Sequence, residues 1–124
     1  MAYDSENIFA KILRGEIPCD RVFENDNALA FRDIAPQTPV HILVIPKGAY
    51  VSMDDFSENA SDVEIGDLIR AVGHVARENG LVDPGYRILA NHGRDGHQEV
   101  PHFHVHVFGG RDLGGMVRRA SSEG

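Results

Sequence analysis

The sequence is poor in cysteine, in basic residues and in long apolar runs, and each shortage excludes a class of protein. Cys19 is the only cysteine among 124 residues, so the chain cannot form an intrachain disulfide. Lys and Arg number 12 against 19 Asp and Glu, and the net charge of −7 disfavours the coating of nucleic acid or of an anionic membrane. No apolar run approaches the roughly 20 residues that a membrane helix needs. Residues 1–6 are acidic and lack the apolar core of a signal peptide, so we expect a cytoplasmic protein without membrane or nucleic-acid partners.

The rest of the composition is that of an ordinary globular protein. Hydrophobic residues make up 42% and charged residues 25%, which supports a packed core and argues against disorder along the whole chain. The length suits one domain over residues 1–124. We expect the polar end, residues 121–124, to be frayed.

The hydrophobic pattern predicts two helices. One covers residues 5–15, with Ser5 as N-cap and Gly15 as its stop. The main helix covers residues 61–79 and begins with the capping box Ser61-x-x-Glu64.

The same pattern predicts strands, which are expected over residues 20–24, 28–33, 41–46, 86–91 and 100–108. The strand 41–46 is almost wholly apolar, so we expect both its faces to be covered. Turn residues between neighbouring strands favour antiparallel hairpins. The chain therefore reads as an α+β sheet with its helices on one face.

Three of the seven histidines fall within five residues, at His102, His104 and His106. Side chains alternate between the two faces of a strand, so these three imidazoles should share one face while Phe103 and Val105 point into the core. Neighbouring imidazoles would lie about 6.6–7 Å apart. Three ionisable rings in a row do not help folding, so the pattern indicates chemistry.

Two kinds of chemistry fit such a row. Neutral imidazole is a common zinc ligand, but ligand bonds to zinc are only about 2.0–2.1 Å long, so three ligands along one strand can hardly meet a single ion. Imidazole can also attack phosphorus, with neighbouring histidines orienting it and protonating a leaving group.

The pattern His-φ-His-φ-His-φ-φ resembles the motif of the histidine triad (HIT) nucleotide-binding proteins. Further matches follow in the order of that family, over residues 7–115, and residues 109–114 resemble its Hint branch. These matches are Ile8-Phe9-x-Lys11-Ile12, Ala30-Phe31-Arg32-Asp33-Ile34, Pro36-Gln37, residues 41–47, Gly85-Tyr86-Arg87 and residues 91–110.

The resemblance implies a five-stranded antiparallel sheet with two main helices, continued across a two-fold axis in a homodimer. It also implies a purine nucleotide site without metal or cofactor. His104 would be the nucleophile that attacks the α-phosphorus. His102 would orient the ring of His104, partly through its backbone carbonyl. His106 would touch phosphate oxygens, and His41 would complete the polar network.

The same resemblance assigns the substrate contacts. Asp33 would hold the ribose hydroxyls, a role that suits a carboxylate because it can accept from two vicinal hydroxyls. Asn91 would bind near the phosphate, with Gln98 and Glu99 beside the substrate. The base would be walled by six apolar residues, which are Ile8, Phe9, Ile12, Phe31, Ile34 and Leu43.

Three positions depart from the family pattern. Many members carry Gly-Gly-Gln where this chain has Gly96-His97-Gln98, so the His97 side chain could crowd or extend the phosphate site. Glu99 stands where animal members have Ser, as is common in bacterial-type members. Pro101 replaces a frequent Tyr, and proline cannot donate to a ladder, so it should lie at the start of the strand or at a bulge.

We therefore predict a homodimeric hydrolase or transferase that cleaves nucleoside 5′-phosphoramidates of the AMP–amine type through a nucleotidyl-histidine. Two alternatives stay open. One is a regulatory adaptor that binds nucleotide with little catalysis, and the other is a zinc-dependent hydrolase. The sequence does not identify the physiological substrate or the role of the tail, residues 116–124.

Overall fold

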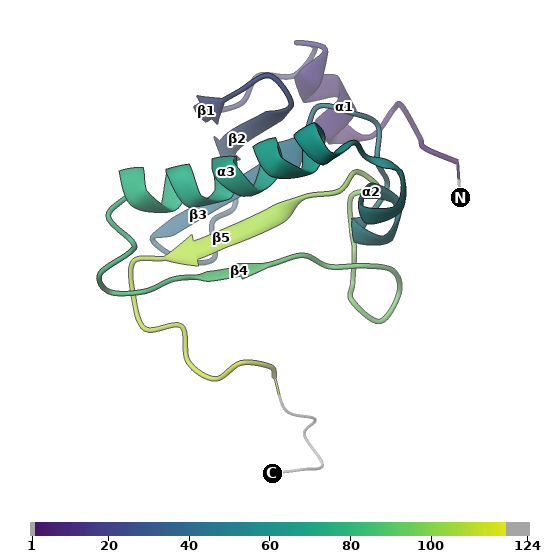
Figure 1. Ribbon diagram of the computed structural model, residues 1–124. Helices are drawn as coiled ribbons and strands as arrows, with labels where there is room; N and C mark the ends of the chain where they lie inside the picture. The colour runs from purple at the N-terminus through teal and green to yellow at the C-terminus, as the bar shows by residue number, and fades with distance from the viewer. Residues whose placement is uncertain (1, 119–124) are drawn as a thin grey trace.

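The computed structural model describes residues 2–118, which form a five-stranded antiparallel sheet with three helices (Figure 1). The strands lie in the order β1-β2-β3-β5-β4. Their bounds are β1 Arg21–Glu24, β2 Ala28–Arg32, β3 Val40–Pro46, β4 Arg87–Leu89 and β5 Val105–Gly109, and the helices are α1 Ile8–Leu13, α2 Met53–Asn59 and α3 Asp62–Glu78. The frayed end expected at 121–124 lies outside the described residues. None of the helices within 2–118 has the length and apolar character needed to cross a membrane.

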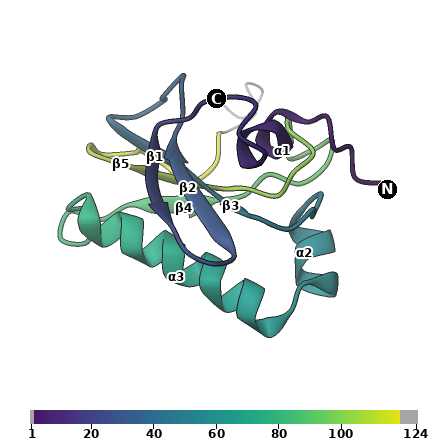
Figure 2. The ribbon, with the colours of Figure 1, turned by 90° about the horizontal axis from the view of Figure 1, so that it is seen from above.

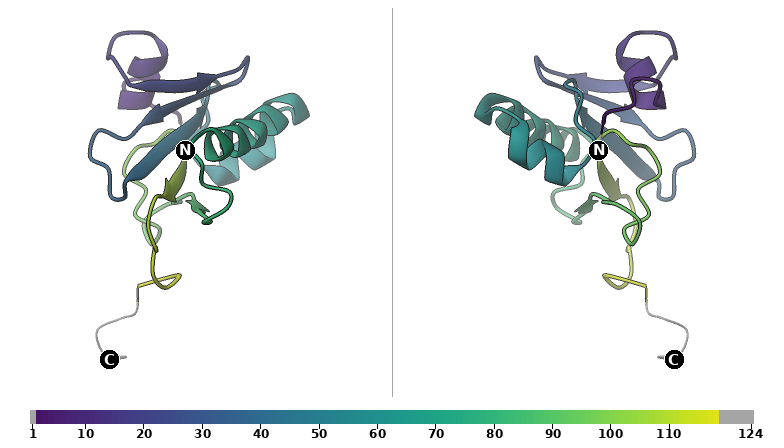
Figure 3. Two further views of the ribbon diagram at one scale, coloured as in Figure 1. Left: turned by 90° about the vertical axis from the view of Figure 1, so that its left-hand side faces the viewer. Right: turned by 90° about the vertical axis from the view of Figure 1, so that its right-hand side faces the viewer.

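The helices cover both faces of the sheet, whereas the sequence predicted them on one face. On β2, Ala28 and Ala30 belong to the core cluster with α3, while Leu29 and Phe31 belong to a second cluster with α1. Views along the sheet show α1 on one side and α2 and α3 on the other (Figures 2 and 3). The physical reason is that β2 and β3 are apolar at both odd and even positions, so each face must be buried. The expected cover on both faces of β3 is confirmed.

The N-cap of helix α1 is Asn7, two residues later than the predicted Ser5. The Asn7 side chain accepts a hydrogen bond from the Ala10 N–H at 2.9 Å and donates to the Asp4 carbonyl at 2.7 Å. Asn7 is 6% exposed, so the helix begins at a buried polar side chain that is hydrogen-bonded to the backbone on both sides. Ser5 lies in the preceding turn, and the cap bond to the first helical turn is made by Asn7.

Helix α3 begins as predicted. The Ser61 hydroxyl accepts from the Glu64 N–H, and the Glu64 carboxylate accepts from the Ser61 N–H, which completes the capping box. The sequence did not predict α2. Its seven residues bury only Phe56, so the segment has no apolar period to detect, although Ser52 caps it.

The predicted hairpins are present. Asn25 Oδ1 accepts from the N–H groups of Asn27 and Ala28, at 3.0 and 2.8 Å, and this turn joins β1 to β2 as antiparallel neighbours. Strands β4 and β5 also pair antiparallel across the loop that contains residues 92–99.

The last strand is shorter than predicted, since β5 covers Val105–Gly109 and not 100–108. Its pairing with β3 ends at Val44↔Val105. Pro101 has no N–H to donate, and the Phe103 N–H donates to the Tyr50 carbonyl at 2.7 Å instead of to a strand. Residues 100–104 therefore run off the sheet as irregular chain. Because β5 starts late, β4 is also shorter than the predicted 86–91 and its pairing ends at Leu89↔His106.

Candidate active site

The candidate site is the cluster of imidazoles on the α1 side of the sheet, where residues 100–104 lead into β5. Phe9 of α1 lies edge-on to two of the rings, with centroids 6.3 Å from His102 and 4.9 Å from His104. The rings of His104 and His106 lie 5.0 Å apart. Phe103 and Val105 point to the opposite core with α3, so the alternation predicted from the sequence holds although part of the segment is not strand.

His102 has no exposed surface and uses both ring nitrogens. Its Nε2 is 2.8 Å from the Pro46 carbonyl, and its Nδ1 is 2.5 Å from the hydroxyl of Tyr3. A carbonyl oxygen can only accept, so the ring proton is on Nε2 and the Tyr3 hydroxyl donates to Nδ1. Burial lowers the pKa of His102 to about 4, so the ring is neutral near pH 7.

His104 is 7% exposed and donates from Nδ1 to the backbone carbonyl of His102 at 2.7 Å. The proton on Nδ1 leaves Nε2 as a bare nitrogen with its lone pair available. Burial lowers the pKa of His104, against the opposing effects of the His102 carbonyl and the charges of Asp33 and Glu99. The ring is therefore neutral near pH 7, and its bare Nε2 can accept a proton or attack an electrophile.

His41 and His106 form a second pair across β3 and β5. His41 Nδ1 accepts from the Gln37 N–H at 3.2 Å, so its proton is on Nε2, which lies 2.9 Å from His106 Nδ1. His106 Nδ1 then accepts, and its own proton is on Nε2. Burial, followed by the neighbouring rings of His104 and His41, lowers the pKa of His106 to about 4, and burial lowers the pKa of His41. The site thus holds a neutral N–H donor, His106 Nε2, beside the bare Nε2 of His104.

Asp33 follows β2 and brings a carboxylate to this pair. Its Oδ2 lies 3.5 Å from His41 Nε2, and its Oδ1 accepts from the Ala35 N–H at 2.8 Å. One ligand atom from each of Asp33, His41 and His106 lies within 4.8 Å of the others, so these three could hold a metal ion after small adjustments. The two imidazoles already satisfy each other by a hydrogen bond, so the geometry does not require an ion.

The six apolar residues predicted to wall a base fall into two groups. Four are at most 7% exposed and belong to the core cluster behind the site; these are Phe9, Ile12, Phe31 and Leu43. Ile8 and Ile34 are 43% and 93% exposed, so they are free to meet a ligand. Four of the six predicted residues therefore pack in the core behind the site, and only Ile8 and Ile34 have side chains exposed to a ligand.

The Gln98 side chain forms hydrogen bonds to three backbone segments beside the triad. Its Nε2 donates to the carbonyls of Val51 and Val100, at 2.6 and 3.1 Å, while its Oε1 accepts from the Gly93 N–H. These bonds use both N–H donors and one acceptor position of the amide oxygen, so Gln98 acts here as a structural link. Asn91 is half-buried after β4, and Glu99 is exposed.

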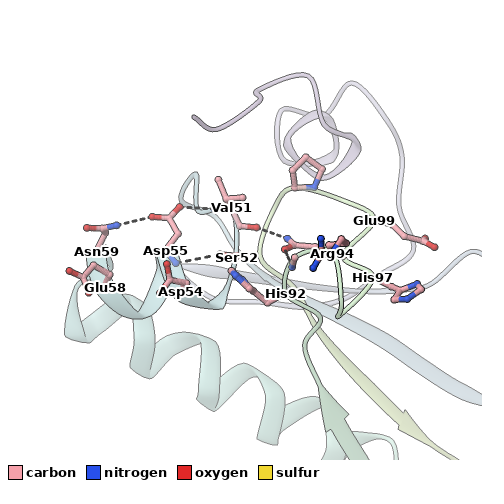
Figure 4. Close-up of a pocket in the computed structure, with 13 residues that line it drawn as sticks. Val51, Ser52, Asp54, Asp55, Glu58, Asn59, His92, Arg94, His97 and Glu99 are labelled. Atoms are coloured by element: carbon pink, nitrogen blue, oxygen red, sulfur yellow. Dashed lines mark hydrogen bonds between the residues drawn. The ribbon is translucent and has the colours of Figure 1, made fainter. Parts of the chain in front are cut away.

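Gln98 and Glu99 also line an open groove of about 850 Å³ between the start of α2 and the loop 92–99 (Figure 4). His97 lines this groove and not the imidazole cluster. It has φ +58°, in the left-handed region that glycine adopts without strain, which explains why a glycine is suited to this position. Pro101 also lines the groove, and it lies on the irregular chain four residues before β5, not at the start of the strand or at a bulge as the sequence predicted.

Three contributors to the site were not predicted from the sequence. The Pro46 carbonyl and the Gln37 N–H are backbone groups, which carry no residue-type signal. Tyr3 lies ahead of α1 in a polar stretch without periodicity, and only the folded chain brings it to His102.

Comparison with known proteins agrees with this architecture. The model of the HIT domain matches residues 14–113, and the chain belongs to this family. It is 64% identical over 117 residues to an uncharacterized 13.2 kDa HIT-like protein of Azospirillum brasilense, covering 94% of this chain and 96% of that protein. It is 44% identical over 112 residues to the purine nucleoside phosphoramidase of Escherichia coli strain K12, covering 90% and 93%.

The fold is shared with solved members of the family. The structure of a HIT family hydrolase from Clostridium thermocellum superposes with a TM-score of 0.84 at 33% identity, over 93% of this chain and 99% of that one. The five-stranded antiparallel sheet predicted from the sequence is thereby confirmed.

Proposed function

We propose that this chain is a Hint-type hydrolase that cleaves purine nucleoside 5′-phosphoramidates, with His104 as the nucleophile. The observation that carries the proposal is the hydrogen bond from His104 Nδ1 to the His102 carbonyl, which leaves Nε2 bare in a buried, neutral ring. A nucleophile of this kind needs no prior deprotonation. The name of the Escherichia coli relative supports the choice of substrate class.

The reaction would proceed by two displacements. In the first, the lone pair of His104 Nε2 attacks the α-phosphorus, the P–N bond breaks, and the departing amine takes up one proton. In the second, water attacks the nucleotidyl-histidine, the P–Nε2 bond breaks, and the proton lost by water balances the first step. The products are the nucleoside monophosphate and the free amine, and the same pathway yields a transferase when another nucleophile replaces water.

The neighbouring groups have complementary roles in this scheme. His106 Nε2–H donates to a non-bridging phosphate oxygen, and His41 holds that ring through the 2.9 Å bond to Nδ1. Asp33 accepts from the ribose hydroxyls through its carboxylate. Ile8 and Ile34 contact the purine, and Glu99 and Asn91 lie toward the phosphate and the leaving group.

The proposal is tested with a fluorogenic adenosine phosphoramidate. We expect turnover by the native chain and none by a His104→Ala variant that still binds AMP in calorimetry. Binding of AMP without turnover by the native chain would favour the regulatory adaptor. Loss of turnover in a chelator, with recovery on added zinc, would favour the zinc-dependent hydrolase and the set formed by Asp33, His41 and His106.

We further propose that the partner of this chain is a second copy. Strand β4 is an edge of the sheet, and next to it α2, α3 and β4 line an apolar groove of about 300 Å³. Met53, Ile69 and Ile88 line it while being 52%, 60% and 48% exposed. An exposed edge beside exposed apolar side chains gains by pairing with its own copy about a two-fold axis.

Light scattering at micromolar concentration should give twice the chain mass, and Ile88→Asp should give the monomer. Val82→Asp is the matched control, because Val82 is 57% exposed but lies outside that groove. A native monomer would contradict the homodimer.

A further inference from the structure

Tyr3 belongs to none of the motifs of the site, yet it contacts His102, the first histidine of the triad. Its hydroxyl lies 2.5 Å from His102 Nδ1, and the two rings meet at 69° with centroids 5.6 Å apart. Tyr3 is half-buried and His102 is fully buried. The bond therefore fastens the segment ahead of α1 to a residue 99 positions away.

The direction of this bond follows from the other side of the ring. Nε2 of His102 gives its proton to the Pro46 carbonyl, so Nδ1 of the neutral ring can only accept. The Tyr3 hydroxyl donates and satisfies this nitrogen. Among the described residues, no buried side-chain nitrogen or oxygen lacks a hydrogen-bond partner, and loss of this hydroxyl would create one.

The position of His102 matters because its backbone carbonyl holds the proposed nucleophile. The peptide group that links His102 to Phe103 accepts from His104 Nδ1 at 2.7 Å and donates to the Tyr50 carbonyl at 2.7 Å. This peptide precedes β5, so no strand ladder fixes it. A tilt of the His102 ring would reach His104 through the carbonyl and through Phe9, which touches both rings.

We propose that Tyr3 is a positioning residue for the catalytic histidine. Its hydroxyl holds the His102 ring from the Nδ1 side, which keeps the His102 carbonyl aligned with His104 Nδ1 and keeps His104 Nε2 bare. This inference rests on the proposed role of His104 as nucleophile. Tyr3 itself does not touch the substrate in this scheme, so its effect is on the reacting geometry and not on substrate binding.

The test compares the Tyr3→Phe variant with a matched control, Tyr50→Phe. The control loses a hydroxyl that bonds to the Glu64 carboxylate, but keeps the backbone carbonyl that holds the Phe103 N–H. Nitrogen-15 NMR of the histidine rings is measured on the full chain at neutral pH. In Tyr3→Phe we expect the His102 Nδ1 resonance to move downfield as its donor is lost. We also expect the two His104 nitrogens to move toward averaged values as the second tautomer becomes populated.

Phosphoramidate kinetics give the functional readout. Tyr3→Phe should lower kcat roughly 10- to 100-fold with KM nearly unchanged, whereas Tyr50→Phe should retain native kcat. A native kcat in Tyr3→Phe overturns the proposal, and so does a loss of kcat with native histidine resonances. If the native chain does not cleave phosphoramidates, the proposed function fails by itself. The resonances of His104 then decide alone whether Tyr3 controls the tautomer of that ring.

Discussion

At the scale of single residues, the site depends on where four ring protons lie. Backbone groups fix three of them, because the carbonyls of Pro46 and His102 accept and the Gln37 N–H donates. The fourth proton, on His106 Nε2, follows from the bond to His41. The bare Nε2 of His104 and the Nε2–H of His106 thus belong to neighbouring rings, and neither ring carries a charge near pH 7. His106→Ala and His41→Ala should therefore lower turnover less than His104→Ala does. Positioning and proton transfer are each worth roughly 10²- to 10⁴-fold in rate, and phosphoramidate kinetics of the three variants measure the difference.

The proposal gives Asp33 a role in substrate binding and none in the chemical step. In the proposed complex its carboxylate accepts from the ribose hydroxyls and does not touch the reacting phosphorus. Hydrogen bonds to a charged group contribute about 1.5–3 kcal/mol, so Asp33→Ala should raise KM roughly 10- to 100-fold and lower kcat less. Steady-state kinetics measure both constants, with Asp83→Ala as an exposed acidic control. A fall in kcat with native KM would place Asp33 in the chemical step instead.

At the scale of elements, the start of α1 connects the fold to the site. Phe9 lies two residues after the N-cap Asn7, and its ring packs on His104. Asn7→Ala removes the bond to the Ala10 N–H and should lower the free energy of unfolding by about 1–2 kcal/mol. Ser5→Ala changes a residue that does not cap the helix and should stay within about 0.5 kcal/mol of native. Urea unfolding measures both. The opposite ranking would restore Ser5 as the N-cap.

The elements that the sequence predicted well are those with a strong period or a specific cap. The apolar stripe and capping box of α3 and the apolar run of β3 are local signals, and both elements are present. Helix α2 has one buried residue, and its formation depends on the packing of Phe56 against Phe103, a contact that no local pattern reveals.

The last strand was predicted too long for a related reason. The alternation of histidine and apolar residues continues through 102–108, and it correctly separates the two faces. Hydrogen bonding stops at Val105, because the chain before it turns to the Tyr50 carbonyl and the end of β3. Face assignment is a property of local sequence, whereas pairing requires a partner. The contact of Tyr3 with His102 also requires a partner that is distant in sequence, so the local motif indicates His104 but not Tyr3.

At the scale of the whole molecule, the buried imidazoles link stability to pH. Burial lowers the pKa of His102 and of His106 to about 4, against about 6.5 in an unfolded chain. Between these values the unfolded state binds protons that the folded state does not, so the contribution of these rings is complete above pH about 6.5 and is lost as the pH falls toward 4. For fully buried His102 the loss is at most about 3 kcal/mol.

Urea midpoints measured from pH 7.5 to pH 4.5 should therefore fall on acidification. Carboxylates also titrate at the acid end, so the comparison is with His102→Gln, which should lose less stability over the same range. Equal pH dependence of the two chains would show that His102 is protonated as readily in the folded state as in the unfolded state.

The central claim is that His104 forms the covalent intermediate, and trapping that intermediate tests it most directly. The native chain is mixed with an adenosine phosphoramidate, quenched in alkali, in which phosphoramidate bonds to histidine tend to survive, and digested for mass spectrometry. The account predicts an added adenylyl group on the peptide that contains residues 102–106, located at His104 by fragmentation and missing in His104→Ala. An adduct on another residue, or native turnover by His104→Ala, would contradict it.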